Sequence, residues 1–188
     1  MKKSKYSNKV RIIGGKWRGR KLPFLNLELL RPTPDRVRET LFNWLAPIID
    51  GAYCLDLFAG SGALGFEALS RGAGKVVFVD SEPQIIEQLK TNQQTLNCEN
   101  IEIYNMPAEK YLQQANQPFD VIFLDPPFQQ QAIPKYCQLL VKKNLIKPKG
   151  YIYIETGHML DSSCLPQNWQ IIKQKQAGKV LYSLIQTL

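Results

Sequence analysis

The sequence predicts an α/β fold in which helices cover both faces of a mostly parallel sheet. From residue 52 onward, short apolar runs alternate with amphipathic segments, as in repeated strand–helix units. A glycine-rich loop at residues 59–65 follows the first of these runs. The last part of the chain breaks the alternation, and the turn residues 177–179 between two apolar runs indicate a β-hairpin.

Each element has its own signal, starting with a helix near Pro34. Thr33 can cap this helix and Pro34 can occupy its first turn. Its apolar face comprises Val37, Leu41, Trp44 and Leu45. The polar residues Arg36, Arg38, Glu39 and Asn43 fall mostly on other faces. Strands are predicted at residues 52–58, 75–80, 101–105, 119–124 and 151–156, and the hairpin at 169–176 and 180–188. Helices are predicted at 62–71, 83–96, 107–115 and 132–143, the second opened by a capping box at residues 81–84.

Positive charge is concentrated at the N-terminus. The chain has 24 Lys and Arg against 16 Asp and Glu, and nine of the cations precede the first acid, Glu28. Aromatic and glycine residues interleave with these cations, which is typical of RNA binding. We expect residues 1–30 to form a basic RNA-binding arm and residues 31–188 a domain whose apolar faces begin at Val37. The candidate RNA contacts are Lys9, Arg11, Lys16, Trp17, Arg18, Arg20 and Lys21. A solvated tail that aids solubility is the alternative.

Composition excludes several classes of protein. No run of apolar residues exceeds four, which is too short for a membrane-spanning helix or a signal peptide. The four cysteines lack the C-x-x-C spacing of zinc sites, so we expect reduced, packed thiols and no metal. The lack of a spanning helix and of a signal peptide predicts a cytoplasmic protein, and we expect it to be a monomer.

The glycine loop predicts a nucleoside-cofactor site. Gly60, Gly62 and Gly65 form G-x-G-x-x-G between a predicted strand and a predicted helix, where bare backbone amides can approach a ligand. Asp80 ends the next strand, 20 residues after Gly60, where a carboxylate can accept hydrogen bonds from both ribose hydroxyls. NAD fits this spacing. However, Asp56 at the end of the first strand would repel a pyrophosphate, which favours a positively charged cofactor such as S-adenosylmethionine (SAM).

A second motif, Asp125-Pro126-Pro127-Phe128, follows the predicted strand 119–124. Strand ends of parallel sheets share one crevice, so this motif and the glycine loop should face the same ligands. The carboxylate and rigid carbonyls can accept hydrogen bonds from the exocyclic amine of a base, and Phe128 can stack on the base. A simple turn at the end of the strand is the alternative.

Together these motifs resemble those of class I SAM-dependent methyltransferases that modify exocyclic amines. Residues 11–22 and 30–44 resemble a narrower family, the bacterial RsmD-type 16S ribosomal RNA (guanine-N2)-methyltransferases. The resemblance implies a Rossmann-like fold with a seven-stranded sheet and SAM as cofactor. It also implies one target guanine in small-subunit ribosomal RNA, either as free RNA or within assembled or assembling 30S particles.

The resemblance also implies roles for individual residues. It places Asp56, Phe58, Gly60 and Gly62 at the methionine end of SAM, Asp80 at the ribose, Ser81 beside the adenosine, and Met106 to Ala108 near the adenine. Asp125, Pro126, Pro127 and Phe128 would hold the guanine. Thr33 and Arg36 would lie over the cofactor carboxylate or at the RNA entrance, and both placements stay open. Many class I enzymes carry an acid near the Ala108 position, so a backbone carbonyl or Glu109 must substitute here.

Two further residues have predicted roles, and two other functions fit the same sequence. Glu155 ends a strand at the same edge and can line the pocket, whereas the single histidine, His158, is expected to have a surface or supporting role. The motif chemistry also fits adenine-N6 or cytosine-N4 methylation of DNA. A non-catalytic dinucleotide- or RNA-binding module is the alternative from another class.

Overall fold

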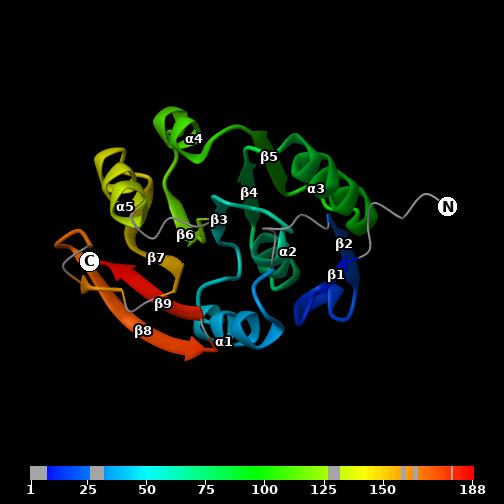
Figure 1. The fold of residues 1–188 in the computed structure, drawn as a ribbon, viewed down its shortest axis with the longest axis horizontal. Helices are drawn as coiled ribbons and strands as arrows, with labels where there is room; N and C mark the ends of the chain where they lie inside the picture. The colour runs from blue at the N-terminus through cyan, green and yellow to red at the C-terminus, as the bar shows by residue number, and fades with distance from the viewer. Residues whose placement is uncertain (1–7, 26–31, 127–131, 158–159, 163–164, 179) are drawn as a thin grey trace.

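The computed structural model describes residues 8–25, 32–126, 132–157, 160–162, 165–178 and 180–188. A central sheet has the strand order β5-β4-β3-β6-β7-β9-β8 (Figure 1). Its strands are β3 (Tyr53–Asp56), β4 (Lys75–Asp80), β5 (Ile101–Asn105), β6 (Phe119–Leu124), β7 (Ile146–Thr156), β8 (Trp169–Ala177) and β9 (Val180–Thr187). The α-helices are α1 (Asp35–Leu45), α2 (Ala63–Ser70), α3 (Pro83–Leu96), α4 (Ala108–Gln114) and α5 (Ile133–Lys142). The predicted α/β class and seven-stranded sheet are confirmed.

Strand direction brings the carboxyl ends of several strands to one edge. β3 pairs in parallel with both β4 and β6, and β6 pairs in parallel with β7. β9 runs antiparallel to β7 and β8, which confirms the predicted hairpin. β7 begins at Ile146, five residues before the predicted start at residue 151, and Phe119 of β6 pairs with Ile146 beyond a register shift. The alternation of apolar and polar residues does not reveal the first five residues of β7, because the pairing with β6 is irregular there.

The sheet separates two apolar layers because neighbouring residues of a strand point to opposite faces. On β3, Cys54 belongs to a core cluster with side chains of α1, α2 and α3. The next residue, Leu55, belongs to a second cluster with side chains of α4 and α5. Trp169 and Tyr182 of the terminal hairpin are buried at the sheet edge. Helices therefore cover both faces, as predicted.

The N-terminal segment is part of this core. β1 (Asn8–Arg11) and β2 (Lys21–Phe24) form an antiparallel hairpin around the short 3-10 helix η1 (Gly15–Trp17). One face of the hairpin is buried in the same cluster as α2 and α3, through Val10, Ile12, Trp17, Leu22 and Phe24. The expectation that apolar packing begins at Val37 is therefore wrong. Charge dominates the composition here and obscures a strand alternation that buries every second side chain.

Two predicted helix caps do not form. The N-cap residue of α1 is Pro34, without a side-chain hydrogen bond, because the Thr33 hydroxyl donates to Glu155 instead. The N-cap of α3 is Glu82, and no side-chain cap is present there either. The Glu82 amide donates to a carboxylate oxygen of Asp80 at 2.9 Å, so the preceding strand end supplies the acceptor that a capping side chain would otherwise provide.

The remaining composition-based expectations concern thiols, metals and membranes. Cys54, Cys98 and Cys137 are buried and form no disulfide within the described ranges, while Cys164 lies outside them. Among the residues with described positions, no group of acids, histidines and cysteines could hold a metal ion. No helix in the described part of the chain is long and apolar enough to span a membrane.

Candidate active site

Four adjacent strands carry an acid at the same edge of the sheet. Asp80 ends β4, Asp56 ends β3, Asp125 directly follows β6, and Glu155 lies one residue before the end of β7. These strands are neighbours in the order β4-β3-β6-β7. The topology therefore assembles the predicted acids, which are separated by up to 99 positions in the sequence, into one row.

The glycine loop packs closely around this row. Asp56 is 3% exposed, and its Oδ2 accepts a hydrogen bond of 3.0 Å from the Gly65 amide. A Cβ atom at Gly65 would lie 2.3 Å from the Phe78 ring, so only glycine permits this approach of α2 to β4. Gly62 has a φ of +75°, and a Cβ there would lie 2.6 Å from Phe66. The glycines are therefore needed for the turn and for helix packing.

Asp80 is held with its carboxylate oriented. Its Oδ2 accepts the Gly60 amide at 3.0 Å and its Oδ1 accepts the Glu82 amide at 2.9 Å. The Asn105 side-chain amide donates to the main-chain carbonyls of Asp80 and Ser81. Each carboxylate oxygen keeps a second acceptor site, so a ribose diol can still be bound. The free acceptor sites of Asp80 therefore fit the ribose of SAM.

Burial and mutual repulsion shift the acids toward their neutral forms. Burial, with a further contribution from the Asp80 charge, raises the pKa of Asp56 to about 8. Burial also raises the pKa of Asp80. Burial, together with the charges of Glu155 and Asp56, raises the pKa of Asp125 well above its ordinary value. A cation bound at this edge would relieve the repulsion, whereas a pyrophosphate would add to it. The electrostatics thus favour SAM over a dinucleotide.

Of the motif that is predicted to bind the base, the structure describes only the first two residues. The structure brings Asp125 and Pro126 to the edge beside Asp56, and both are part-buried. Pro127, Phe128 and His158 lie outside the described residues, so their predicted roles stay predictions.

The other predicted cofactor residues surround the same edge. Phe58 lies just beyond β3, and its ring contacts Tyr136 of α5 edge-on at 5.2 Å. The Met106 amide donates to the Asp80 carbonyl at 3.0 Å, which places the predicted adenine segment beside the predicted ribose site. Ala108 begins α4 and is 8% exposed. Glu109 forms an ion pair with Lys135.

Helix α1 presents a different arginine to the interior from the one singled out in the sequence. Arg36 is exposed, whereas Arg38 is 1% exposed and donates to the Thr33 carbonyl at 3.1 Å. Arg38 also pairs with Asp35 and with the buried Glu67. The placement of Arg38 on an outward face is wrong. Its position three residues before Leu41, on the apolar face, is the signal that could have revealed it.

Glu67 clamps the N-terminal hairpin onto α2. It is completely buried and accepts the Ile13 and Gly14 amides, each at 2.8 Å. The guanidinium groups of Arg38 and Arg71 donate to the same carboxylate at 3.4 Å and 2.7 Å. Because α2 starts at the glycine loop, this carboxylate links the basic hairpin to the candidate cofactor site. The sequence signal is a single acid within an otherwise apolar helix.

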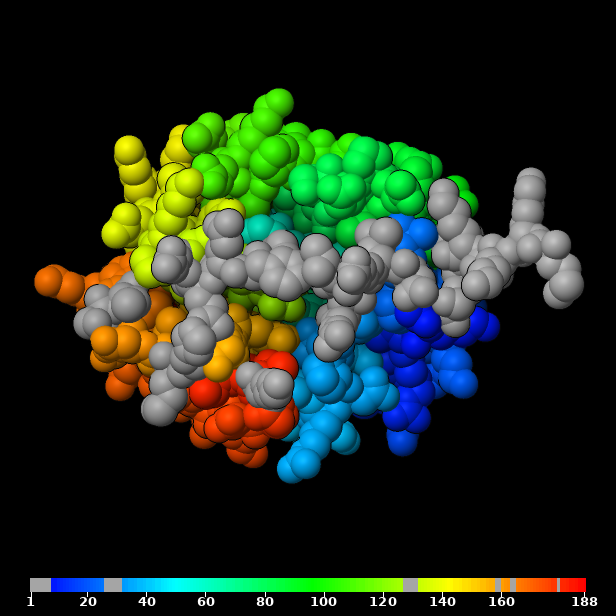
Figure 2. All heavy atoms as spheres, in the orientation of Figure 1, coloured from blue at the N-terminus to red at the C-terminus, as the bar shows by residue number. Residues whose placement is uncertain are grey.

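The cations of the hairpin point away from the core. Figure 2 shows the hairpin in blue at one end of the molecule, far from the red and orange strands β8 and β9. The six predicted RNA-contacting cations are exposed: Lys9, Arg11, Lys16, Arg18, Arg20 and Lys21. Arg11 pairs with Asp35 at 3.0 Å. Trp17 differs from them, because its ring is 8% exposed and packs in the core, where it offers no free face for stacking on a base.

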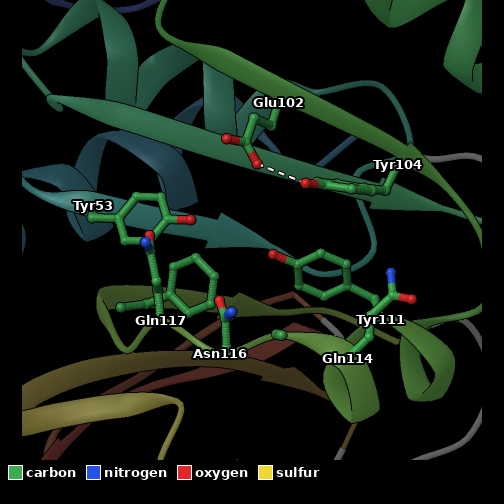
Figure 3. A pocket seen from close by; sticks show the side chains of 9 residues that line it. Tyr53, Glu102, Tyr104, Tyr111, Gln114, Asn116 and Gln117 are labelled. Carbon is green, nitrogen blue, oxygen red and sulfur yellow. Dashed lines mark hydrogen bonds between the residues drawn. The ribbon is translucent and has the colours of Figure 1, made fainter.

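A separate cavity lies at the opposite end of the sheet, where β3 and β6 begin (Figure 3). Its volume is about 290 Å³. The Tyr53 and Phe119 rings stack at 4.5 Å, and Tyr104 donates to Glu102 at 2.8 Å. Lys75 also pairs with Glu102. The charged groups in this cavity are paired with one another, and none of the predicted site residues reaches it.

Comparisons with known proteins identify the family of this chain. A family model described as "Conserved hypothetical protein 95" matches residues 10–186. The chain belongs to this family.

Its relatives include two proteins named "Ribosomal RNA small subunit methyltransferase D". The Haemophilus influenzae protein is 53% identical over 182 residues, covering 94% of this chain and 93% of the relative. The Escherichia coli K12 protein is 44% identical over 188 residues, covering 99% and 95%. The solved structure of the Escherichia coli protein yhhF matches with a TM-score of 0.87 at 44% identity, covering 96% of this chain and 98% of that chain. The predicted family and the class I methyltransferase fold are confirmed.

Proposed function

We propose that this protein transfers a methyl group from SAM to the exocyclic N2 amine of a guanine in small-subunit ribosomal RNA. The observation that carries the proposal is the row of four acids beside the glycine loop. It suits a cofactor with a sulfonium and an ammonium group. The names of the close relatives, which specify small-subunit ribosomal RNA, support the substrate class.

In this proposal each residue has a distinct task. The Asp80 carboxylate accepts hydrogen bonds from the two ribose hydroxyls, and the amides near Gly60 and Gly62 border the methionine end beside Asp56. SAM supplies an electrophilic methyl group on a positively charged sulfur. Asp125 and the Pro126 carbonyl accept hydrogen bonds from the guanine amine. They orient its lone pair toward the methyl carbon, so that the new N–C bond forms as the C–S bond breaks.

The exposed hairpin cations are proposed to contact RNA phosphates. They belong to a hairpin within residues 8–25 whose apolar face packs in the same core as α2 and α3, so the proposed RNA contacts lie on the same packed body as the acidic edge. We propose that a single copy of the chain acts on RNA. Free RNA and an assembled or assembling 30S particle are separate substrates that the assay below distinguishes.

The test is labelled methyl transfer by the purified protein. Small ribosomal subunits, naked small-subunit RNA, transfer RNA and DNA are offered separately, and the modified nucleoside is identified by mass spectrometry. We expect N2-methylguanosine in small-subunit RNA. Asp125→Ala serves as the matched control, which should bind SAM normally but lose about 10²–10³ in rate. Methyladenine or methylcytosine in DNA would overturn the proposal, and so would a dinucleotide released from the purified protein in place of SAM or its demethylated product.

A further inference from the structure

Glu155 lies beside the proposed amine-binding group. In the β6–β7 pairing Leu124 is opposite Ile154, so Asp125 and Glu155 follow at the same level on neighbouring parallel strands. Burial, followed by the charge of Glu155, raises the pKa of Asp125, in agreement with this neighbouring placement. A base whose amine is held at Asp125 would therefore present an adjacent atom of its edge to Glu155.

The Glu155 carboxylate is held in one orientation. Thr33 Oγ1 donates to Oε1 at 2.7 Å, and the Tyr153 hydroxyl donates to the same Oε1 at 2.8 Å. Thr33 is 6% exposed and Tyr153 is fully buried, so both donors are fixed by packing. Among the residues whose positions are described, none donates a hydrogen bond to Oε2. Burial raises the pKa of Glu155, and the hydrogen bonds from Thr33 and Tyr153 oppose this by favouring the ionised form, in which Oε2 can accept a hydrogen bond.

The atom next to the exocyclic amine differs among the bases. Guanine carries a ring N1–H donor beside its N2 amine. Adenine and cytosine carry a ring nitrogen lone pair, an acceptor, beside their amines. An acceptor at this place in the site therefore matches guanine and opposes the other two bases, because two acceptors leave a buried polar group unpaired.

We propose that Glu155 is a specificity-determining residue that accepts the guanine N1–H through Oε2, while Asp125 holds the N2 amine. This inference rests on the proposed guanine-N2 activity and adds the group that selects the base. The Asp-Pro-Pro motif alone suits any exocyclic amine, so a neighbouring group must distinguish guanine from adenine and cytosine. Thr33, from the segment that leads into α1, is then a positioning residue for Glu155.

The two hydrogen bonds to Oε1 predict how Glu155→Gln changes the preference for the base. The amide oxygen of glutamine should take the Oε1 place, where it keeps both hydrogen bonds that the Thr33 and Tyr153 hydroxyls donate to Oε1. Its NH2 group then takes the Oε2 place and presents a donor to the base. The variant should disfavour guanine and favour a base with an acceptor beside the same amine. 2-Aminopurine is such a base, because it keeps the N2 amine and lacks the N1 hydrogen.

The experiment measures single-turnover methyl transfer to RNA carrying guanine or 2-aminopurine at the mapped target position. Wild-type protein should prefer guanine by at least about tenfold, the lower end for a hydrogen bond to a charged group. Glu155→Gln should reduce or invert this ratio by about 10- to 100-fold. The control Glu102→Gln, at the opposite end of the sheet, should leave the ratio unchanged.

Two results would overturn the inference, and a third would refute the function on which it rests. Equal wild-type rates on the two bases would overturn it without any variant, which covers the case in which Glu155→Gln does not fold. A folded Glu155→Gln variant with the wild-type ratio would also overturn it and leave the proposed function standing. Absence of N2-methylguanosine from wild-type reactions would instead refute the proposed function itself.

Discussion

Replacing Glu67 by glutamine should strongly destabilise the protein, because the buried carboxylate accepts four hydrogen bonds. Oε1 receives the Gly14 amide and Arg71 Nε, and Oε2 receives the Ile13 amide and Arg38 Nη1. An amide NH2 group cannot accept, so either orientation of the glutamine leaves two donors unpaired. The uncharged side chain also removes one of the two carboxylates paired with the buried Arg38 and leaves only Asp35. Breaking a buried ion pair typically costs about 3–5 kcal/mol.

This loss converts into a measurable shift of the melting temperature. At about 2–4 °C per kcal/mol for a domain of this size, Glu67→Gln should lower the Tm by about 6–20 °C. Urea unfolding followed by circular dichroism gives the free energy of unfolding for comparison. The control is Glu87→Gln, which removes an exposed pair with Lys90 and should cost at most about 1 kcal/mol. If Glu67→Gln unfolds within 1 kcal/mol of the wild type, the clamp does not hold the hairpin as argued.

Three other perturbations test the electrostatics and the RNA surface. Burial raises the pKa of Asp56 to about 8 in the folded protein, so the protonated side chain stabilises the fold most at low pH. Its contribution to the free energy of unfolding falls by up to about 1.4 kcal/mol per pH unit between about pH 4 and 8. Asp56→Asn cannot ionise and should remove this slope, so parallel wild-type and variant curves of unfolding free energy against pH would contradict the assignment. Asp80→Ala should weaken SAM binding by about 10- to 100-fold, because two hydrogen bonds from the ribose to a carboxylate are lost. Calorimetric titration measures the affinity, and an unchanged value would mean that the ribose binds elsewhere. The triple variant Lys16→Gln, Arg18→Gln and Lys21→Gln should flatten the slope of log affinity against log salt by about 2 on single-stranded RNA, at an unchanged Tm. The same substitutions at Lys142 and Lys143 give the control, and equal slopes for both variants would reject the hairpin as the RNA surface.

Local sequence patterns predicted most of the secondary structure. The bounds of β4, α3, β5 and β6 agree with the predicted ranges residue for residue, because each is a periodic run with clear turn residues on both sides. The hairpin β1–β2 was missed, since its strands have four residues each and its alternation is hidden among cations. The early part of β7 was missed for a similar reason.

The residues of the candidate site were likewise predictable only where the signal is local in the sequence. Asp56, the glycines and Asp80 were identifiable because the cofactor chemistry depends on a short motif and on a fixed spacing within one strand–helix–strand unit. Glu67, Arg38 and the Thr33 contact to Glu155 were not. Their partners lie far away in sequence, as with Thr33 and Glu155, which are 122 positions apart.

The sequence by itself therefore determined the α/β class, the glycine loop and the placement of acids at the strand ends, since these follow from local periodicity and the rules of parallel sheets. Only the tertiary structure decided that the basic N-terminal segment is a core hairpin clamped by Glu67, and that Glu155 stands beside Asp125 with one oxygen anchored. The role of a buried polar group depends on its hydrogen-bond partners. Those partners meet when strands and helices from distant parts of the chain pack together.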